Sequence, residues 1–366
     1  MPPRYRPDLD RIHPYRPGRP IAEVAAEFGL TDVVKLASNE NPEPPFPEVQ
    51  EAIAAHAAGV NRYPDNSKPL LVGALSDHLG VPQERIWCGG ASNELMLITA
   101  FSMGGPGTSA VYGWPSFGLY QIGSRAAFAD DIAVPLDASH RHDLDAMLAA
   151  IRDDTTVVYV CNPNNPTSTH VAGDDLEAFI RAVPGHALVV IDEAYAEFAT
   201  ADDYRSMLPL AVELDNVMVT RTFSKVYGLA GLRVGYGVTH PASIERFRRI
   251  QLPFTVNTLG EVAAVEALKH QDRVKERIAD NAERVAFLAT ALRGRGLEVA
   301  DSQTNFVYAD FGDRARAITD ALLERGIIVR PVIPEGWLRI TAGRPEENER
   351  LVRALDRIGL GATADD

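Results

Sequence analysis

The feature that most constrains the fold is a series of short apolar segments separated by stretches with helical periodicity. Four of these segments are rich in Val and Ile and end in polar or glycine-bearing residues: "TSAVYG", "TTVVYVCNPNNPT", "ALVVIDEAY" and "NVMVTRTFSK". Short continuous apolar strands with intervening helices are typical of a parallel sheet covered by helices on both faces. The sequence therefore predicts an α/β fold with a large, mostly parallel sheet.

The segments before and after this region predict two further parts. Residues 1–35 combine a Pro-punctuated arm, which needs a partner surface to be ordered, with a short helical pattern ending at Gly29. After about residue 250 come a long amphipathic stretch of one or two helices and then alternating strands and helices. We expect an N-terminal arm and helix at 1–35, a large domain at 36–250 and a smaller α+β domain at 251–366, with a frayed tail "GATADD".

Charge and cysteine usage narrow the class of protein. The chain has 366 residues, 46% of them hydrophobic, which is enough for one large core or two moderate ones. A net charge of -14 disfavours nucleic-acid and anionic-membrane surfaces, because these need clustered Lys and Arg, so we expect a small-molecule substrate. The chain has only two cysteines and no apolar leader, which predicts a cytoplasmic protein. Its nine histidines lack metal-ligand spacing, so we expect no metal.

One lysine stands out in a chain that mostly uses arginine. Only five of the 36 basic residues are lysines, and Lys225 directly follows an apolar strand and the step "TFS". Arginine keeps its proton in proteins, whereas a lysine amine can be tuned toward a neutral nucleophile. Lys225 is therefore a candidate for covalent chemistry.

Polar residues follow three other predicted elements. Asn165 comes after one strand, Asp192 ends another with Tyr195 three residues on, and the small residues 89–93 precede a helix that could face a phosphate. Taken singly, these are ordinary turns and helix caps, and Arg233 is an ordinary surface cation. Together with the Lys225 amine, they meet the needs of a pyridine cofactor that carries an aldehyde and a phosphate.

The motifs resemble those of a known enzyme family. "NPNNPT", "DEAY" and "SKVYGLAGLRVG" resemble fold-type I pyridoxal-phosphate aminotransferases, and "KLASNENP", "RYPD" and "SQTNFV" resemble the histidinol-phosphate aminotransferase group and the related aromatic amino acid aminotransferases. The likeness runs from "HPYRPG" to "EENERLV". It implies pyridoxal 5'-phosphate as cofactor and a ping-pong amino transfer between histidinol phosphate and 2-oxoglutarate or glutamate.

The resemblance also assigns roles to residues of the cofactor site. It implies that Lys225 forms a Schiff base with the cofactor and shuttles a proton, while Asp192 pairs with the pyridinium nitrogen. Asn165 and Tyr195 would hydrogen-bond the phenolic oxygen. The phosphate would be held by backbone, hydroxyl and guanidinium groups of five residues: Ser92, Asn93, Thr222, Ser224 and Arg233.

Other roles concern the ring face, the second subunit and the substrate. Phe117 matches the aromatic residue that stacks on the ring, with core packing as the alternative. Tyr63 matches a tyrosine that reaches the phosphate from a partner subunit, which, with the N-terminal arm, implies a homodimer with composite active sites. Arg339 matches the arginine that grips a carboxylate, and Arg330 and Tyr15 match positions that bind the substrate phosphate. Asn165 also belongs to the expected substrate site.

Departures from the family pattern leave the substrate open. Ser168 replaces the usual Gly after "NPT", Gly90 and Ala91 depart from "GNGS", and the loop "PVIPEG" is short, which leans toward the aromatic enzymes. "SNELM", "HRHDLDAML" and "LRITAG" lean toward histidinol phosphate.

Two functions other than amino transfer also use this cofactor: decarboxylation, as in the threonine-phosphate decarboxylases, and cofactor sensing by a domain of a transcription regulator. The decarboxylases resemble the same group of sequences and stay open here. The sensor is disfavoured because no helix-turn-helix segment precedes "KLASNENP" and the chain is acidic.

Overall fold

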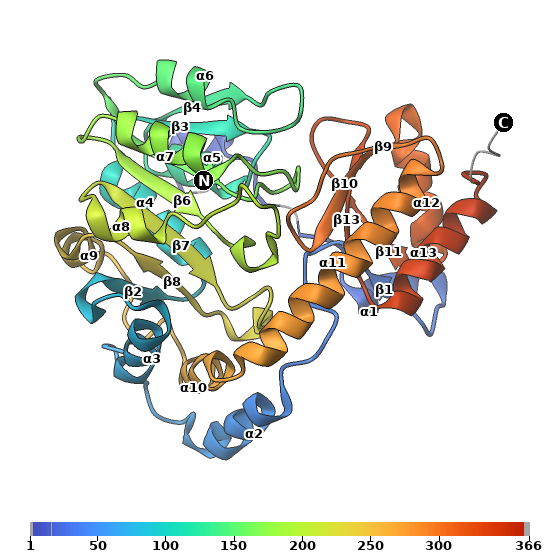
Figure 1. Ribbon diagram of the computed structural model, residues 1–366, viewed down its shortest axis with the longest axis horizontal. Coiled ribbons are helices and arrows are strands. Elements are labelled where there is room, and N and C mark those ends of the chain that lie inside the picture. Colours follow the sequence, from blue (N-terminus) through green and yellow to red (C-terminus); the bar gives the residue numbers. More distant parts are fainter. Residues whose placement is uncertain (1–2, 16, 362–366) are drawn as a thin grey trace.

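A seven-stranded sheet forms the centre of the larger of two lobes in the computed structural model, which describes residues 3–15 and 17–361 (Figure 1). The strand order is β2-β8-β7-β6-β5-β3-β4, and β8 alone runs antiparallel to its neighbours. The strands are β2 (Ile86–Gly89), β3 (Ser109–Trp114), β4 (Asp130–Pro135), β5 (Thr155–Cys161), β6 (Leu188–Asp192), β7 (Val217–Thr222) and β8 (Gly235–Val238). The predicted mostly parallel sheet is confirmed, and the four predicted strands are β3, β5, β6 and β7.

Helices cover both faces of this sheet. Along β5, Val158 and Val160 belong to one buried cluster, whereas Val157 and Tyr159 belong to another on the opposite face. This alternation explains why the strands read as continuous apolar runs. The helices of this lobe are α2 (Pro47–His56), α3 (Pro69–Leu79), α4 (Ser92–Met103), α5 (Leu119–Ala126), α6 (Leu144–Ala149), α7 (Gly173–Ala182), α8 (Leu208–Glu213), α9 (Pro241–Phe247) and α10 (Thr258–Leu268).

The smaller lobe contains a four-stranded antiparallel sheet in the order β12-β13-β10-β9. A parallel pair, β1 with β11, attaches the N-terminal segment to this lobe, and α1 ends at Gly29, which adopts φ 65°. The elements are α1 (Ile21–Phe28), β1 (Val34–Lys35), α11 (Gln271–Arg293), β9 (Glu298–Val299), β10 (Phe306–Asp310), α12 (Ala315–Glu324), β11 (Ile327–Ile328), β12 (Arg330–Pro331), β13 (Trp337–Thr341) and α13 (Pro345–Arg357). Short 3-10 helices are η1 (Pro7–Arg11), η2 (Ala57–Gly59), η3 (Gln83–Arg85), η4 (Ala196–Phe198), η5 (Ala230–Leu232) and η6 (Gly312–Arg314).

The long amphipathic stretch forms two helices, α10 and α11. α10 packs on α2 and α3, and its Ala263 and Ala264 belong to the core beside the large sheet. α11 runs between the lobes (Figure 1): Val274 near its start belongs to the large core, whereas Leu288 belongs to the small one. The expected limits at 35 and 250 remain predictions, and we propose that the small domain begins within α11.

The N-terminal arm lies against α5 of its own chain. Arg6 donates to the Ala126 carbonyl at 3.0 Å and its guanidinium lies 4.2 Å from the centre of the Phe128 ring, while Arg125 donates to the Arg11 carbonyl at 2.8 Å. The arm therefore has contacts within its own chain, and its packing on a second subunit stays a prediction. The predicted frayed tail lies, from residue 362 onward, outside the described residues.

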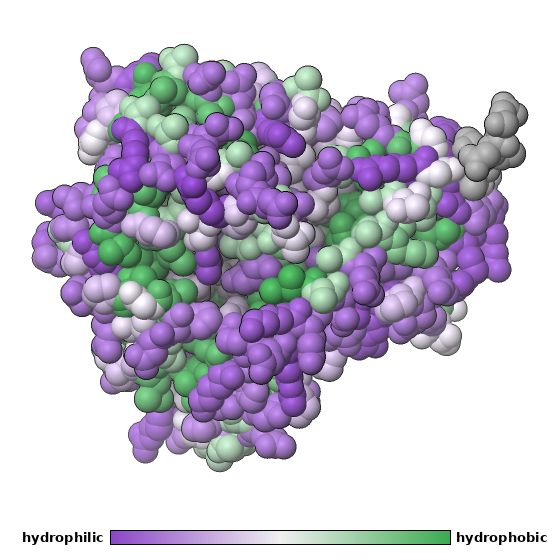
Figure 2. Space-filling view, viewed as in Figure 1, coloured by the Kyte–Doolittle hydropathy of each residue, from purple (hydrophilic) through white to green (hydrophobic). Residues whose placement is uncertain are grey.

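Hydrophilic residues cover most of the face shown in Figure 2, with smaller hydrophobic areas between them. Within the described residues, no helix has the length and apolar character needed to cross a membrane.

Candidate active site

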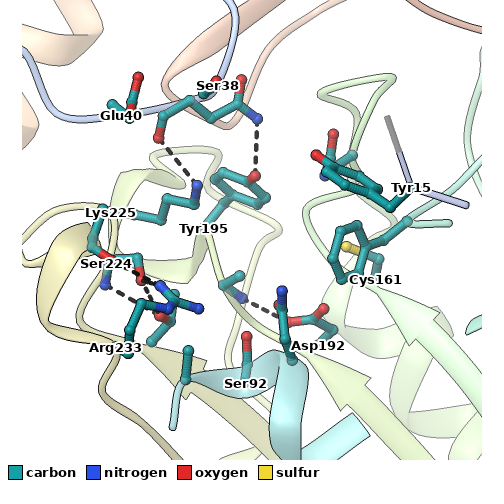
Figure 3. Close-up of a pocket in the computed structure, with 18 of the residues that line it drawn as sticks. Tyr15, Ser38, Glu40, Ser92, Cys161, Asp192, Tyr195, Ser224, Lys225 and Arg233 are labelled. Atoms are coloured by element: carbon teal, nitrogen blue, oxygen red, sulfur yellow. Dashed lines mark hydrogen bonds between the residues drawn. The ribbon is translucent and has the colours of Figure 1, made fainter. Parts of the chain in front are cut away.

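A cavity of about 220 Å³ lies beyond the carboxyl ends of β5, β6 and β7 and is bordered by the start of α4 (Figure 3). Its position is the one expected for a ligand site in an open α/β sheet. Twelve residues predicted from the sequence line it: Tyr15, Ser92, Asn93, Phe117, Asn165, Asp192, Tyr195, Thr222, Ser224, Lys225, Arg233 and Arg339.

Lys225 presents its amine to this cavity three residues after the end of β7. Its Nζ donates to the Asn39 carbonyl at 3.1 Å and lies 5.6 Å from the centre of the Tyr195 ring. Burial, reinforced by the nearby Arg339 guanidinium, lowers the pKa of Lys225 to about 8. An amine with this pKa is partly neutral near pH 7 and can act as a nucleophile.

Asp192 ends β6 and is only 3% exposed. It accepts hydrogen bonds from the Tyr120 hydroxyl at 2.8 Å and from the Ala194 amide at 3.2 Å. Burial raises the pKa of Asp192 to about 6, and these hydrogen bonds act in the opposite direction. Such a carboxylate remains ionised at neutral pH and gains from a cation that enters the cavity.

Hydroxyls and a guanidinium gather at one end of the cavity, where Figure 3 shows Ser224 beside Arg233. Thr222 Oγ1 donates to Ser224 Oγ at 3.0 Å, and Arg233 Nη1 lies 3.4 Å from the same oxygen. The first turn of α4, a 12-residue helix, borders this end, and the backbone N–H groups at the start of a helix lack i→i−4 partners within it. Gly235 is required here, because a Cβ on it would lie 2.5 Å from the Ser92 nitrogen. The combination suits a phosphate group.

A buried arginine and an amide line the side nearer the small lobe. Arg339 is 8% exposed and donates to Asn165 Oδ1 at 2.6 Å and to the Ala37 carbonyl at 2.7 Å. Its Nε is buried without a hydrogen-bond partner. An unpaired buried donor of this kind destabilises the protein, so an anionic ligand that reoriented the guanidinium fork would be bound favourably.

Phe117 is half-buried at the wall of the cavity and meets the Tyr120 ring edge to face at a centroid distance of 5.8 Å. The position leaves the Phe117 ring available both for core packing and for stacking on a bound ring, as the sequence predicted.

Two predicted residues do not line the cavity. Arg330 is opposite Arg339 in the β12–β13 ladder, and its guanidinium lies 5.8 Å from the centre of the Tyr15 ring. Tyr63 is 82% exposed and stacks on Phe254, with centroids 4.7 Å apart. The expected role of Tyr63 in the site of a partner subunit stays a prediction.

Sequence reasoning missed four cavity or near-cavity groups. Tyr120 bonds Asp192, and the only signal for it was its position three residues after Phe117, at the start of α5. Asn39 and Glu40 belong to the motif "KLASNENP", which pointed to the family but to no role for either residue. Cys161, the last residue of β5, lines the cavity, although cysteine usage indicated only a reducing compartment.

Comparison with known proteins identifies the class. The family model for aminotransferase class I and II matches residues 31–355. Similar proteins include a histidinol-phosphate aminotransferase of a Geobacillus species, 41% identical with 96% of each chain covered, and an aromatic amino acid aminotransferase of Streptomyces coelicolor, 41% identical with 97% of each covered. The crystal structure of histidinol-phosphate aminotransferase from Sinorhizobium meliloti in complex with pyridoxal-5'-phosphate superposes with a TM-score of 0.90 at 30% identity, covering 97% of each chain.

The chain therefore belongs to the class I and II aminotransferases, and the predicted fold class and transaminase activity are confirmed. Within this family its sequence groups with the histidinol-phosphate aminotransferases. The similarity to a histidinol-phosphate aminotransferase over 96% of each chain supports an enzyme rather than a cofactor sensor.

The cavity fits the cofactor of this family. It offers a partly neutral lysine amine for an aldehyde, a buried carboxylate for a protonated ring nitrogen, and an anion-binding end built from hydroxyls, Arg233 and the start of α4. The glycine at 235, where any side chain would displace the start of α4, keeps the phosphate end open. Pyridoxal 5'-phosphate is thus the cofactor that the donor set suits.

Proposed function

We propose that this enzyme moves an amino group between histidinol phosphate and 2-oxoglutarate or glutamate by a ping-pong mechanism, with pyridoxal 5'-phosphate as cofactor, as a step of histidine biosynthesis. The observation that carries the substrate assignment is that Arg330, although outside the cavity lining, lies beside two residues that do line it: it is opposite Arg339 in the β12–β13 ladder, and its guanidinium is 5.8 Å from the centre of the Tyr15 ring. Two guanidiniums and a phenol suit a phosphate dianion. The 41% identical Geobacillus enzyme, which bears this name, supports the same assignment.

The bound cofactor supplies an electrophilic aldehyde and an electron-withdrawing ring. Lys225 would contribute the nucleophilic amine and would take the proton from the substrate carbon that bears the amino group. Asp192, as an anion, would hold a protonated ring nitrogen. Tyr195 and Asn165 would donate to the phenolic oxygen, and Arg233 with the start of α4 would hold the phosphate.

The test is to follow the first half-reaction by cofactor absorbance with histidinol phosphate, phenylalanine, tyrosine and glutamate in turn. Glutamate serves both candidate enzymes, so the comparison is among the other three donors. Histidinol phosphate should react with a higher second-order rate constant than phenylalanine or tyrosine. Rapid reaction with phenylalanine beside no reaction with histidinol phosphate would overturn the proposal. The Streptomyces coelicolor relative makes the aromatic aminotransferase the second candidate. The 21% identical threonine-phosphate decarboxylase shares the fold alone, and formation of the keto product separates a transaminase from a decarboxylase.

Arg330→Ala should penalise histidinol phosphate much more than phenylalanine. Loss of one charge-assisted contact to phosphate is worth about 1.5–3 kcal/mol, which corresponds to about 10- to 150-fold in kcat/KM. Phenylalanine needs only one carboxylate fork, which Arg339 supplies. The measurement is the ratio of the two kcat/KM values, with Arg325→Ala, an exposed arginine after α12, as the control. Equal losses for both donors would mean that Arg330 has a structural role only.

We also propose that the active unit is a cytoplasmic homodimer in which Tyr63 completes the site of the other subunit. Tyr63 and Leu252 are 82% and 71% exposed, and the Tyr63–Phe254 stack places a phenol on an apolar surface that a second copy would cover. Tyr63 does not line the cavity of its own chain.

Mixing Lys225→Ala subunits with Tyr63→Phe subunits tests the composite site. In a heterodimer one site lacks both groups and the other has both, so activity should return. Random pairing of equal amounts should restore about a quarter of the wild-type sites. The measurement is specific activity before and after verified subunit exchange, with each parent alone as control. Activity no higher than the sum of the parents, from a Tyr63→Phe parent that is itself severely impaired, would contradict the proposal.

A further inference from the structure

Asn39 connects the small lobe to two groups of the active site. It lies in the loop after β1, is 1% exposed and has φ 52°. Its carbonyl accepts hydrogen bonds from Lys225 Nζ and from Asn305 Nδ2, each at 3.1 Å. Its side-chain Nδ2 donates to the Tyr195 hydroxyl at 2.9 Å. Its backbone N–H donates to Thr341 Oγ1, in β13, at 2.9 Å.

These bonds fix the direction in which each proton is donated. Because Thr341 Oγ1 already accepts the backbone N–H of Asn39, its own proton is available for Asn39 Oδ1, 3.2 Å away. The amide oxygen is thereby turned to Thr341 and the amide NH₂ to Tyr195. A hydroxyl that accepts such a bond keeps its own proton for a different acceptor. Tyr195 lines the cavity, so that acceptor is a bound ligand.

We infer that Asn39 and Thr341 form a positioning pair that turns the Tyr195 hydroxyl proton toward the cavity, where Tyr195 donates it to the phenolic oxygen of the cofactor. The inference rests on the proposed function and deepens it, because it assigns the direction of one hydrogen bond to Asn39 and Thr341, two residues that have no other role in the proposed mechanism.

The surroundings of Tyr195 agree with a donor role. Burial raises the pKa of Tyr195 well above its ordinary value, so the phenol retains its proton throughout the working pH range. The nearby cation Arg339 and the Asn39 hydrogen bond act in the opposite direction. Thr341 follows Arg339 by two residues in β13, so the same strand carries the substrate arginine and the start of the hydrogen-bond chain.

Asn39→Asp tests the direction of the bond. Aspartate has the size of asparagine and tolerates the left-handed backbone at φ 52°, but its carboxylate accepts the Tyr195 proton instead of donating to the hydroxyl. The phenolic oxygen of the cofactor then loses a donor. Because a donor stabilises the charged form of its acceptor, the pH midpoint of the cofactor absorbance change in the holoenzyme should rise by about one unit.

A double-mutant cycle separates this effect from the added charge. In the Tyr195→Phe background the hydroxyl is absent, so Asn39→Asp should shift the midpoint much less than in the wild type. Asn41→Asp adds the same charge two residues away, where the Asn41 side chain bonds the Lys225 and Val226 carbonyls, and should also shift it less. Thr341→Val is a neutral variant that releases the Asn39 amide and should shift the midpoint upward by a smaller amount.

Each outcome decides between the interpretations. Equal Asn39→Asp shifts in the wild-type and Tyr195→Phe backgrounds, or an unchanged midpoint in Asn39→Asp, would overturn the inference while leaving the cofactor in place. If Asn39→Asp fails to fold, as judged by thermal unfolding, Thr341→Val decides alone, and an unchanged midpoint overturns the inference. A wild-type protein with no pH-dependent cofactor absorbance would instead overturn the proposed function, and the inference with it.

Discussion

Replacing Lys225 with alanine should lower the rate of amino transfer by at least about 10⁴-fold, because a nucleophile and a proton carrier disappear together. The variant should still bind the cofactor through its phosphate, but without the absorbance band of the lysine-linked form. Lys269→Ala is the matched control, since this lysine lies at the surface in an ion pair with Glu266. Borohydride reduction of the wild type followed by peptide mapping should find the cofactor on Lys225. A label on another lysine would disprove the assignment.

Because its pKa is lowered, the reactivity of the Lys225 amine should depend on pH. A group whose pKa falls from the ordinary lysine value to about 8 becomes neutral at lower pH, so the reactive fraction grows as the pH rises through 8. The rate at which the cofactor-free protein captures the aldehyde should follow the same curve. A midpoint near that of an exposed lysine would show that burial does not tune this amine.

Asp192→Asn should slow a single half-reaction by about 10²- to 10³-fold, the scale of losing one preorganised electrostatic contact in a buried site. Asparagine keeps the size of the side chain but cannot hold the ring nitrogen in its protonated form. The measurement is the single-turnover rate under saturating amino donor. An unchanged rate would mean that the ring nitrogen has another partner.

The neighbouring acid supplies the control for Asp192. Glu193 is 1% exposed and is held in a 2.8 Å ion pair with Arg221 rather than lining the cavity. Glu193→Gln should therefore lower the thermal stability and change the single-turnover rate little. A large loss of rate in both variants would point to general disruption of this strand end.

The sequence predicted the parts of the site that follow from strand ends. Apolar runs specified β5, β6 and β7, and the rule that ligands bind beyond their carboxyl ends brought Asn165, Asp192 and Lys225 together. These positions depend on local pattern and on sheet topology, both of which are visible in a single chain.

The missed residues depend on contacts between distant segments. Tyr120 and Asp192 are 72 positions apart in the sequence, and Asn39 and Thr341 are 302 apart. Sequence spacing could therefore not predict either contact. The contacts between the arm and α5 could not be predicted for the same reason, because the polar groups of this helix resemble any other solvated face before the packing is known. Helical periodicity could not assign α10 to a lobe, because an apolar face does not specify its partner.

The two arginines assigned to the substrate sit on one antiparallel pair, β12 with β13, in the smaller lobe, whereas Lys225 and Asp192 stand at the sheet of the larger one. In the proposed assignment, donor choice and cofactor chemistry therefore depend on separate parts of the chain. Substitutions in the first part could change the amino donor while the second part keeps the cofactor chemistry; two relatives that are each 41% identical to this chain carry different donor names. For an engineer, the ten residues 330–339 and the arm around Tyr15 are the segment to transplant when a new amino donor is wanted.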